Sequence, residues 1–214
     1  MSDFEFAMVA ARAEAAAAAP TLVLTIRITT TPPVSVHTGI VRCQLQIDPR
    51  RRRYSPAEAE LLLDLFGEPT RWNDTMRPVL WAQVPLVVPR FDGTVDVELP
   101  IPCTYDFGLA SSKYFQALED GEVPILCQFS GTIFLAAPQG FQIAQVPWDK
   151  EASFRLPASM WREAMDQHFP DTAWIRLSRD SFDALSRFRM RQGLPSWEEA
   201  IDRLCAEAEA REPV

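Results

Sequence analysis

Apolar and polar residues alternate along most of the first two thirds of the chain. Side chains at every second position of a β-strand point to the same face, so this pattern predicts strands that place one face in a core. The stretches that show it are 22–28, 41–47, 95–101, 125–135 and 141–146. The last is expected to pair back on the stretch before it across a turn at 137–140. Residues 79–88 are apolar but include Pro85, which predicts an edge strand or a covering segment.

Two helices are predicted between these strands. Residues Ser55–Glu58 form a capping box with proline at the first helical position, and Gly67 ends the leucine-rich turns that follow. A second helix is expected from about Ser111 to Asp120, where Gly121 stops it. Each helix is expected to turn an apolar side toward the sheet.

The last quarter of the chain has a helical pattern. Apolar residues recur at spacings of three and four over 160–168 and again over 182–188. A second capping box, Ser196–Glu199, starts a terminal helix whose apolar stripe is Trp197, Ile201, Leu204 and Ala208. The last two helices are expected to form an antiparallel hairpin about residues 193–195.

Together these elements predict an α+β protein that is mainly β. The expected architecture is an antiparallel β-sandwich-like core with inserted helices and a C-terminal helical segment. Residues 1–20 are assigned to an N-terminal strand and alanine-rich segment, and 21–156 to the β-rich core domain. Residues 157–214 are assigned to the helical segment, which is expected to pack on the core.

Charge and composition exclude several classes of function. The 214 residues include 29 acidic and 21 basic ones, and the net charge of -8 argues against binding to nucleic acid or to an anionic membrane. No stretch approaches the ~20 consecutive apolar residues of a membrane-spanning helix. The acidic N-terminus lacks the basic region of a signal peptide, so a cytoplasmic protein is expected.

Motifs that hold cofactors or metals are also missing from the sequence. The 8 glycines are spread singly and form no phosphate-binding loop. The 4 cysteines include no Cys-x-x-Cys pair, and there are only 2 histidines. Cys43 and Cys127 lie on apolar faces of predicted strands, which is typical of buried free thiols. We therefore expect no cofactor and no metal site.

Four consecutive arginines, Arg50, Arg51, Arg52 and Arg53, precede the first capped helix. Guanidinium groups at a helix N-terminus could hold a carboxylate or a phosphate, because each offers a planar, two-pronged donor. The alternative is a solvated turn whose arginines pair with the excess of acidic residues, and this interpretation is favoured.

Cys103 follows a predicted strand and begins the sequence Cys103-Thr104-Tyr105-Asp106. A thiolate at a strand end could act as a nucleophile if a histidine served as its base. The only histidines are His37 and His168, and neither lies near Cys103 in sequence, so a structural role is favoured. Together with Tyr105, Asp106 and the arginines, Cys103 could instead line one ligand pocket.

The sequence contains 6 tryptophans. Trp72 and Trp148 are each set among polar residues next to predicted turns. Exposed tryptophan and arginine are typical of the residues that dominate protein–protein interfaces. The alternative for each indole is a cover over a sheet edge or a helix junction, with its N–H satisfied.

Several motifs taken together resemble a bacterial family of unknown function with members of about this length. The motifs are Arg52-Arg53-Tyr54-Ser55, Leu65-Phe66-Gly67, Pro102-Cys103-Thr104-Tyr105-Asp106, Phe129-Ser130-Gly131-Thr132 and Pro147-Trp148-Asp149-Lys150-Glu151. The resemblance associates the chain with gene neighbourhoods of nickel-iron hydrogenases, and implies an accessory or assembly role beside a metalloenzyme. It implies no catalytic residue.

The sequence therefore favours a non-catalytic, cytoplasmic, protein-binding accessory or assembly factor. Its expected partner is another protein, bound through Trp72, Trp148 and the arginine cluster. The alternative is a small-molecule or anion-binding protein, or a cysteine-dependent hydrolase, with a pocket near Cys103 and residues 50–53.

Overall fold

Two antiparallel sheets form the framework of the protein. The computed structural model describes residues 3–104, 109–138, 140–172 and 174–211. One sheet has the strand order β1-β2-β6, and the other has the order β4-β3-β7-β8, with β5 paired to β3 and β9 paired to β7. The strands are β1 (Asp3–Ala13), β2 (Thr21–Thr31), β3 (Ser35–Ile47), β4 (Val79–Val88), β5 (Phe91–Asp92), β6 (Thr94–Pro102), β7 (Glu122–Ala137), β8 (Gly140–Val146) and β9 (Glu151–Pro157).

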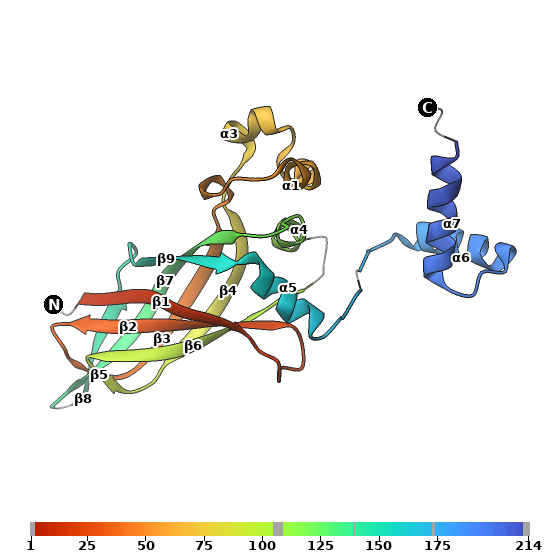
Figure 1. The fold of residues 1–214 in the computed structure, drawn as a ribbon. Helices are drawn as coiled ribbons and strands as arrows, with labels where there is room; N and C mark the ends of the chain where they lie inside the picture. The colour runs from red at the N-terminus through yellow and green to blue at the C-terminus, as the bar shows by residue number, and fades with distance from the viewer. Residues whose placement is uncertain (1–2, 105–108, 139, 173, 212–214) are drawn as a thin grey trace. The chain divides into compact units, whose positions relative to one another are not determined.

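Short helices connect these strands and two longer ones follow them. The helices are η1 (Pro49–Arg51), α1 (Pro56–Leu61), α2 (Leu63–Phe66), η2 (Pro69–Arg71), α3 (Trp72–Thr75), α4 (Ala110–Gln116), α5 (Ala158–Asp166), α6 (Arg179–Gln192) and α7 (Trp197–Glu209). The predicted fold class is confirmed: the chain is mainly β, its sheets are antiparallel and helices are inserted between strands (Figure 1).

The alternating stretches form the sandwich core, as predicted. Along β2 the apolar residues Leu22, Leu24, Ile26 and Ile28 are all buried, while Arg27 between them is exposed. Across the sandwich, the rings of Phe6 on β1 and Phe129 on β7 stack at 4.3 Å. The alternation thus gives each sheet one apolar face, and the two faces pack on each other.

The N-terminal segment contributes more to the core than the sequence pattern indicated. β1 pairs with β2 over nearly its whole length, and Phe4 and Phe6 are buried. β4 lies at the edge of the larger sheet and pairs only with β3, with Pro85 opposite Arg42. An edge position for the proline-containing strand was one of the two expected outcomes.

The first predicted helix is capped as expected but is shorter than expected. Ser55 and Glu58 complete both halves of the capping box. The regular helix ends at Leu61. Leu62, which is fully buried, has φ -90° and ψ -2°, and a separate turn, α2, follows it and ends at Gly67. The second predicted helix also ends early, at Gln116 rather than Asp120, with Tyr114 and Phe115 buried as expected.

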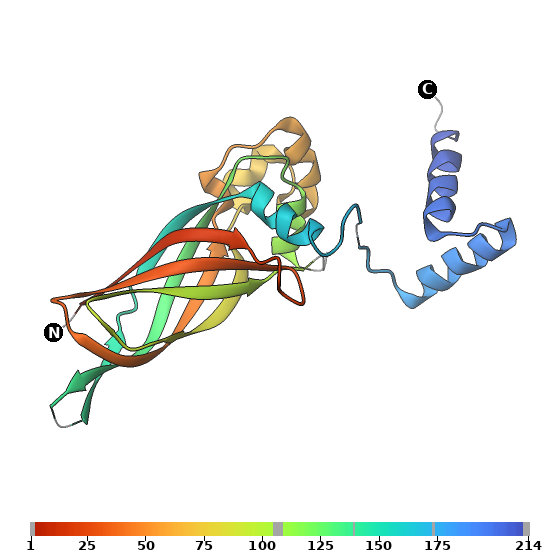
Figure 2. The ribbon, with the colours of Figure 1, turned by 60° about the horizontal axis from the view of Figure 1, so that its bottom comes forward.

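The chain divides into two compact units, Met1–Trp174 and Ile175–Val214. The sequence pattern placed the boundary at residue 157, where strands give way to helices. α5 instead belongs to the first unit, because it packs against β1, β2 and β9. The second unit contains α6 and α7, joined at Gly193, whose φ of 65° ends α6 where the sequence predicted. In Figure 2 the connection runs back over α6, and the axes of the two helices are inclined to each other instead of lying side by side as an antiparallel hairpin.

Candidate functional site

The four arginines do not act as one cluster. The side chain of Arg52 is only 9% exposed and forms an ion pair with Glu58, which is equally buried. It also donates a hydrogen bond to the carbonyl of Asp120 at 2.5 Å. Glu58 in turn accepts hydrogen bonds from the backbone N–H groups of Ser55 at 2.9 Å and Glu119 at 3.0 Å. Arg52 therefore has a structural role, in which it fastens the turn after β3 to α1 and to the loop after α4.

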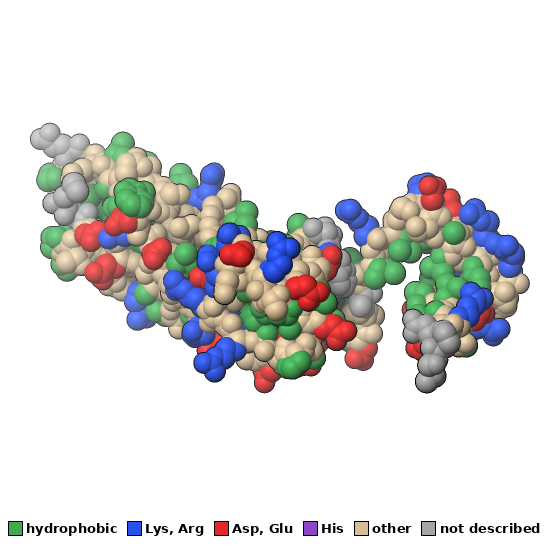
Figure 3. All heavy atoms as spheres, turned by 90° about the horizontal axis from the view of Figure 1, so that it is seen from above, with side chains coloured by type: hydrophobic (Ala, Val, Ile, Leu, Met, Phe, Trp, Pro, Cys, Tyr) green, Lys and Arg blue, Asp and Glu red, His purple; other side chains and the backbone are tan. Residues whose placement is uncertain are grey.

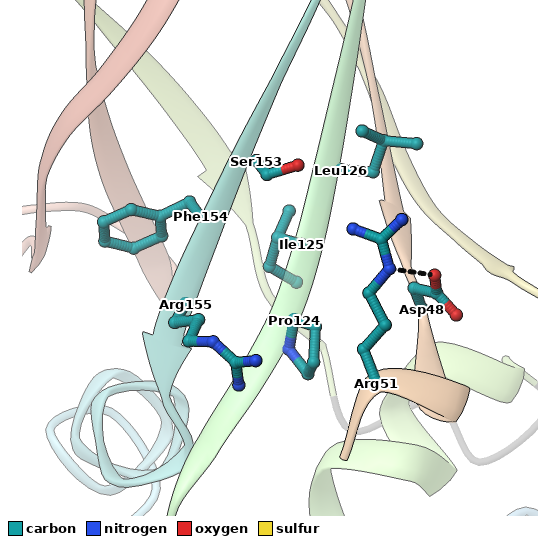
Figure 4. Close-up of a pocket in the computed structure, with 8 residues that line it drawn as sticks. All are labelled: Asp48, Arg51, Pro124, Ile125, Leu126, Ser153, Phe154 and Arg155. Atoms are coloured by element: carbon teal, nitrogen blue, oxygen red, sulfur yellow. Dashed lines mark ion pairs between the residues drawn. The ribbon is translucent and has the colours of Figure 1, made fainter.

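The other three arginines are exposed. Arg51 pairs with Asp48 at 3.0 Å, and Arg50 and Arg53 lie at the surface. Arg51 also lines a hollow of about 320 Å³ on the larger sheet. Figure 4 shows Arg51 and Arg155 on opposite sides of this hollow, with Pro124 between them.

Trp72 has a structural role instead of forming part of an exposed contact surface. Its indole N–H donates to the carbonyl of Gly67 at 2.8 Å, and its ring packs edge-on against Tyr54 at 5.3 Å. The hydroxyls of Tyr54 and Tyr114 lie 2.8 Å apart in a shared hydrogen bond, and burial raises the pKa of Tyr114 to about 12. Trp72 is thus half-buried beside a tyrosine pair, with its polar atom satisfied.

A comparison of Arg52 with Arg50 tests the structural role of the buried ion pair. We expect Arg52→Ala to lower the free energy of unfolding by about 3 kcal/mol, because Glu58 is left buried without its partner. Arg50→Ala removes the same side chain from an exposed position and should change stability by less than about 0.5 kcal/mol. Urea unfolding of both variants measures the difference, and equal losses would contradict a structural role specific to Arg52.

Cys103 lies in a pocket of about 480 Å³, between β4, the end of β6, α4 and α5. Its walls include the rings of Trp81, Phe115 and Trp161. Phe115 stacks on Trp161 at 5.4 Å and meets Trp81 at 5.0 Å. The predicted companions of Cys103, Tyr105 and Asp106, lie outside the described residues. Arg51 lines the separate hollow described above, so the structure does not bring the arginines and Cys103 into one pocket.

The chemistry of Cys103 is that of a protonated thiol. Burial raises its pKa to about 12, and its Sγ donates to the carbonyl of Ile101 at 3.8 Å. The ring nitrogens of His168 contact the carbonyls of Ala164 and Ala17, and the ring of His37 packs on Phe141. Both histidines are thus engaged elsewhere, and neither is placed to act as a base for Cys103.

Thiol labelling distinguishes the four cysteines. At pH 8 we expect a thiol reagent to modify the exposed Cys205 rapidly, while Cys43, Cys103 and Cys127 react only after unfolding. A raised pKa leaves the thiolate, which is the reactive form, scarce until the pH approaches 12. Mass spectrometry of tryptic peptides at increasing pH makes the measurement. Rapid labelling of Cys103 in the folded protein would show an activated thiol and revive the nucleophile interpretation.

β8 is an edge strand with an unprotected apolar surface. It pairs with β7 on one side, and no described strand pairs with it on the other. Phe141 and Ile143 are 60% and 64% exposed, and Trp148, in the turn between β8 and β9, is 92% exposed. We call these three residues the β8 edge surface. In Figure 1 the strand lies at the opposite end of the first unit from α1 and α3.

The local backbone explains how β8 reaches this position. β7 pairs with β9 as far as Gln128 and with β8 from Gly131 onward. A Cβ at Gly131 would lie 2.3 Å from the carbonyl oxygen of Ile40, so only glycine allows this close approach to β3. The following turn is held by Lys150, which pairs with Asp3 at 2.7 Å and keeps the pKa of that carboxyl below its usual value.

A hollow of about 580 Å³ runs beside β8. Its lining includes Asp3, Gln142, Ile143, Gln145 and Pro147, the residue that precedes Trp148. The sequence analysis found Trp148 but treated Phe141 and Ile143 as ordinary strand positions. The signal it missed is the lack of any charged residue from 136 to 147.

Two classes of site are missing from the described ranges. Within them, no three His, Cys, Asp or Glu side chains come together in a way that could hold a metal ion. Nor does any described helix have the length and apolar character needed to cross a membrane.

The fold and site define a β-sandwich protein with a small helical unit and an exposed apolar edge. The chain belongs to a family of unknown function, DUF6084, whose model matches residues 1–213. This confirms the expected membership of a family of unknown function that covers nearly the whole chain.

Other comparisons add little. No curated protein matches the sequence. Among solved structures, beta-glucosidase 3B from Thermotoga neapolitana in complex with alpha-D-glucose is 13% identical with a TM-score of 0.24, and a beta-glucosidase from Kluyveromyces marxianus is 9% identical with a TM-score of 0.24. The matches cover 72% of this chain but only 17% and 15% of those enzymes.

Proposed function

We propose that this protein is a protein-binding accessory or assembly factor that holds its partner at the β8 edge surface. The observation that carries the proposal is Trp148, which is 92% exposed beside an edge strand with two further exposed apolar residues. Tryptophan is the residue type most enriched among those that dominate interface energies. Contiguous exposed apolar groups on a folded protein are typical of interaction sites.

The composition of β8 supports the same proposal. Edge strands in folded proteins are normally protected from other chains by charges or prolines. β8 has neither, whereas β1, β4, β6 and β9 each have at least one: Asp3 and Arg12 in β1, Pro85 in β4, Asp96 and Glu98 in β6, and Glu151 and Arg155 in β9. An unprotected edge is therefore specific to β8 among these five strands.

The partner chemistry that fits this edge is an extended apolar segment. In an antiparallel pair, every second residue directs its N–H and C=O away from its neighbour, so the free side of β8 offers backbone hydrogen bonds to an added strand. The side chains of Phe141 and Ile143 and the hollow beside them would contact alternate residues of that strand. Arg50, Arg51 and Arg53 are exposed but follow the end of β3 that pairs with Ile125, so they are candidate contacts only for a part of the partner beyond the added strand. Arg52 and Trp72 are engaged inside the fold.

The resemblance noted from the motifs suggests where such a partner occurs. We propose that the partner is a protein that takes part in nickel-iron hydrogenase assembly in the bacterial cytoplasm. The net charge of -8 agrees with a protein partner better than with nucleic acid.

Matched substitutions at the two ends of the sheet test the site. Ile143→Lys and Trp148→Ala should each raise the dissociation constant of the partner at least ~30-fold, because each removes a desolvated anchor. Leu80→Lys is the control, since Leu80 is 52% exposed on β4 and lies opposite Gln46, at the other end of the same sheet. Each variant serves as bait in extracts of the source bacterium, and proteins lost with both site variants but kept with the control are then purified and titrated.

Retention of the same proteins by all four baits would show that binding does not use β8. Failure of every bait to retain a protein above background would contradict the protein-binding function itself.

A second candidate function is the binding of a small apolar molecule. The observation that favours it is the 480 Å³ pocket, which lies within the usual range for small ligands and is lined by three aromatic rings. The buried thiol of Cys103 would take part as an apolar contact, since burial keeps it protonated.

The fluorescent probe 8-anilinonaphthalene-1-sulfonate tests this candidate. We expect one saturable site, with an affinity that falls at least ~10-fold in Trp81→Ala, because the pocket loses one aromatic wall. Trp148→Ala removes the same side chain from the exposed turn and should leave the affinity unchanged. Equal losses in both variants, or none in either, would place the probe outside the pocket.

A further inference from the structure

The residues of the second unit, Ile175–Val214, do not cover much of that unit's apolar surface. Among its described residues only Ala200 is buried. Isolated helices of 13 and 14 residues are marginal in water, and in proteins such helices are stabilised by packing of their apolar faces. Units of about 40 residues or fewer usually need a disulfide, a metal or a second chain to be stable. The unit therefore requires another surface.

Several apolar residues of the two helices are not covered by the unit itself. Phe182, in the first turn of α6, meets Trp197, the first residue of α7, at 5.1 Å, and the guanidinium of Arg189 lies over the same indole at 4.2 Å. Met190, Ile201 and Leu204 remain exposed. Figure 3 shows hydrophobic side chains gathered on the concave side of this unit, with charged side chains around its outer side. The result is an open apolar wedge.

The two helices carry opposite charge. α6 has four arginines and two aspartates, whereas α7 has five acidic residues and one arginine. In the part of the unit that the structure describes, no ion pair joins α6 to α7, and Arg203 of α7 pairs with Glu207 of the same helix. Each helix thus presents a charge that the other helix of the same chain does not neutralise by direct pairing.

We propose that the second unit is a dimerisation element, in which α6 of one copy packs against α7 of a second copy. A two-fold dimer requires a surface that is complementary to itself, and a wedge with one basic and one acidic arm has this property. Four helices then enclose the apolar side chains of both wedges, as in a four-helix bundle. The opposite charges of the two helices favour the pairing of the basic α6 of one copy with the acidic α7 of the other.

The charge distribution along the chain favours a second copy as the occupant. Residues 175–214 contain seven of the 21 basic and eight of the 29 acidic residues, which leaves a net charge of about -7 on residues 1–174. Two copies of the second unit can therefore approach with little net repulsion. This inference does not depend on the function proposed for β8.

Paired glutamate substitutions on α7 test the interface in the full-length protein. We expect a dimer by sedimentation equilibrium, and Leu204→Glu should raise its dissociation constant at least ~30-fold by placing a charge in the apolar seam. Ala206→Glu is the control: it adds the same charge two positions away, on the opposite side of the helix, and should change the constant less than ~3-fold. Circular dichroism checks that both variants keep the helical content of the wild type.

A label on Cys205 locates the interface without any substitution in the seam. Cys205 is exposed on α7, whereas the other three cysteines are buried, so a nitroxide reagent is directed to it. Pulsed electron spin resonance should detect a dipolar coupling between two labels, and the coupling should disappear when excess unlabelled protein is added.

Three outcomes would overturn the proposal. The first is a monomer at all concentrations, which would mean that the wedge is covered within the chain or by another protein. The second is a dimer that Leu204→Glu and Ala206→Glu affect equally. The third is a dimer without coupling between the labels, which would place the contact elsewhere, for instance at β8. Loss of the dimer in Trp148→Ala would likewise place the contact at β8.

Discussion

The buried ion pair between Arg52 and Glu58 determines how the inserted helices sit over the sheets. It connects the turn after β3 with the first turn of α1, and through Asp120 it reaches the loop that leads into β7. A buried charge without its partner is strongly destabilising, so these three segments are restricted to one arrangement. Tyr54, Tyr114 and Trp72 pack beside the pair and satisfy their own polar atoms there. This end of the first unit is therefore occupied by structural contacts, and the exposed apolar surface lies at the other end, on β8 (Figure 1).

The sequence predicted what depends on local period and missed what depends on distant contacts. The alternation in β2 and β7 and the capping box at Ser55 are local signals, and the structure confirms them. Arg50 and Arg52 stand in nearly the same local sequence, yet one is exposed and the other buried, because only Arg52 meets Glu58 and Asp120. No pattern within four consecutive arginines carries that difference. The break at Leu62 has the same origin, since a buried tertiary position overrides a continuous helical pattern.

The candidate site was predictable in part. An exposed tryptophan was expected at Trp148 from its polar neighbours, and Trp72 was expected on the same grounds but is engaged with Gly67 and Tyr54. The exposure of Phe141 and Ile143 follows from the position of β8 at the sheet edge, which strand periodicity does not specify. The same limit explains the domain boundary: the change of period at residue 157 marks where helices begin, but α5 packs on the sandwich and belongs to the first unit.

Both proposed contact surfaces lie in parts of the chain with little net charge. The first unit carries nearly all of the net charge of -8, which keeps copies of the sandwich apart at long range. Within that unit β8 is a strand of seven uncharged residues, so contact there depends on short-range apolar burial and backbone hydrogen bonds. The second unit is nearly neutral as a whole but has a basic and an acidic helix, so its contact depends on matching of opposite charges over an apolar seam. Because salt screens exposed charge pairs and affects apolar burial much less, contacts at the two proposed surfaces would respond differently to ionic strength. On these two proposals, the division of charge would allow one chain to form two independent contacts, one through backbone hydrogen bonds and apolar burial and the other through opposite charges over an apolar seam.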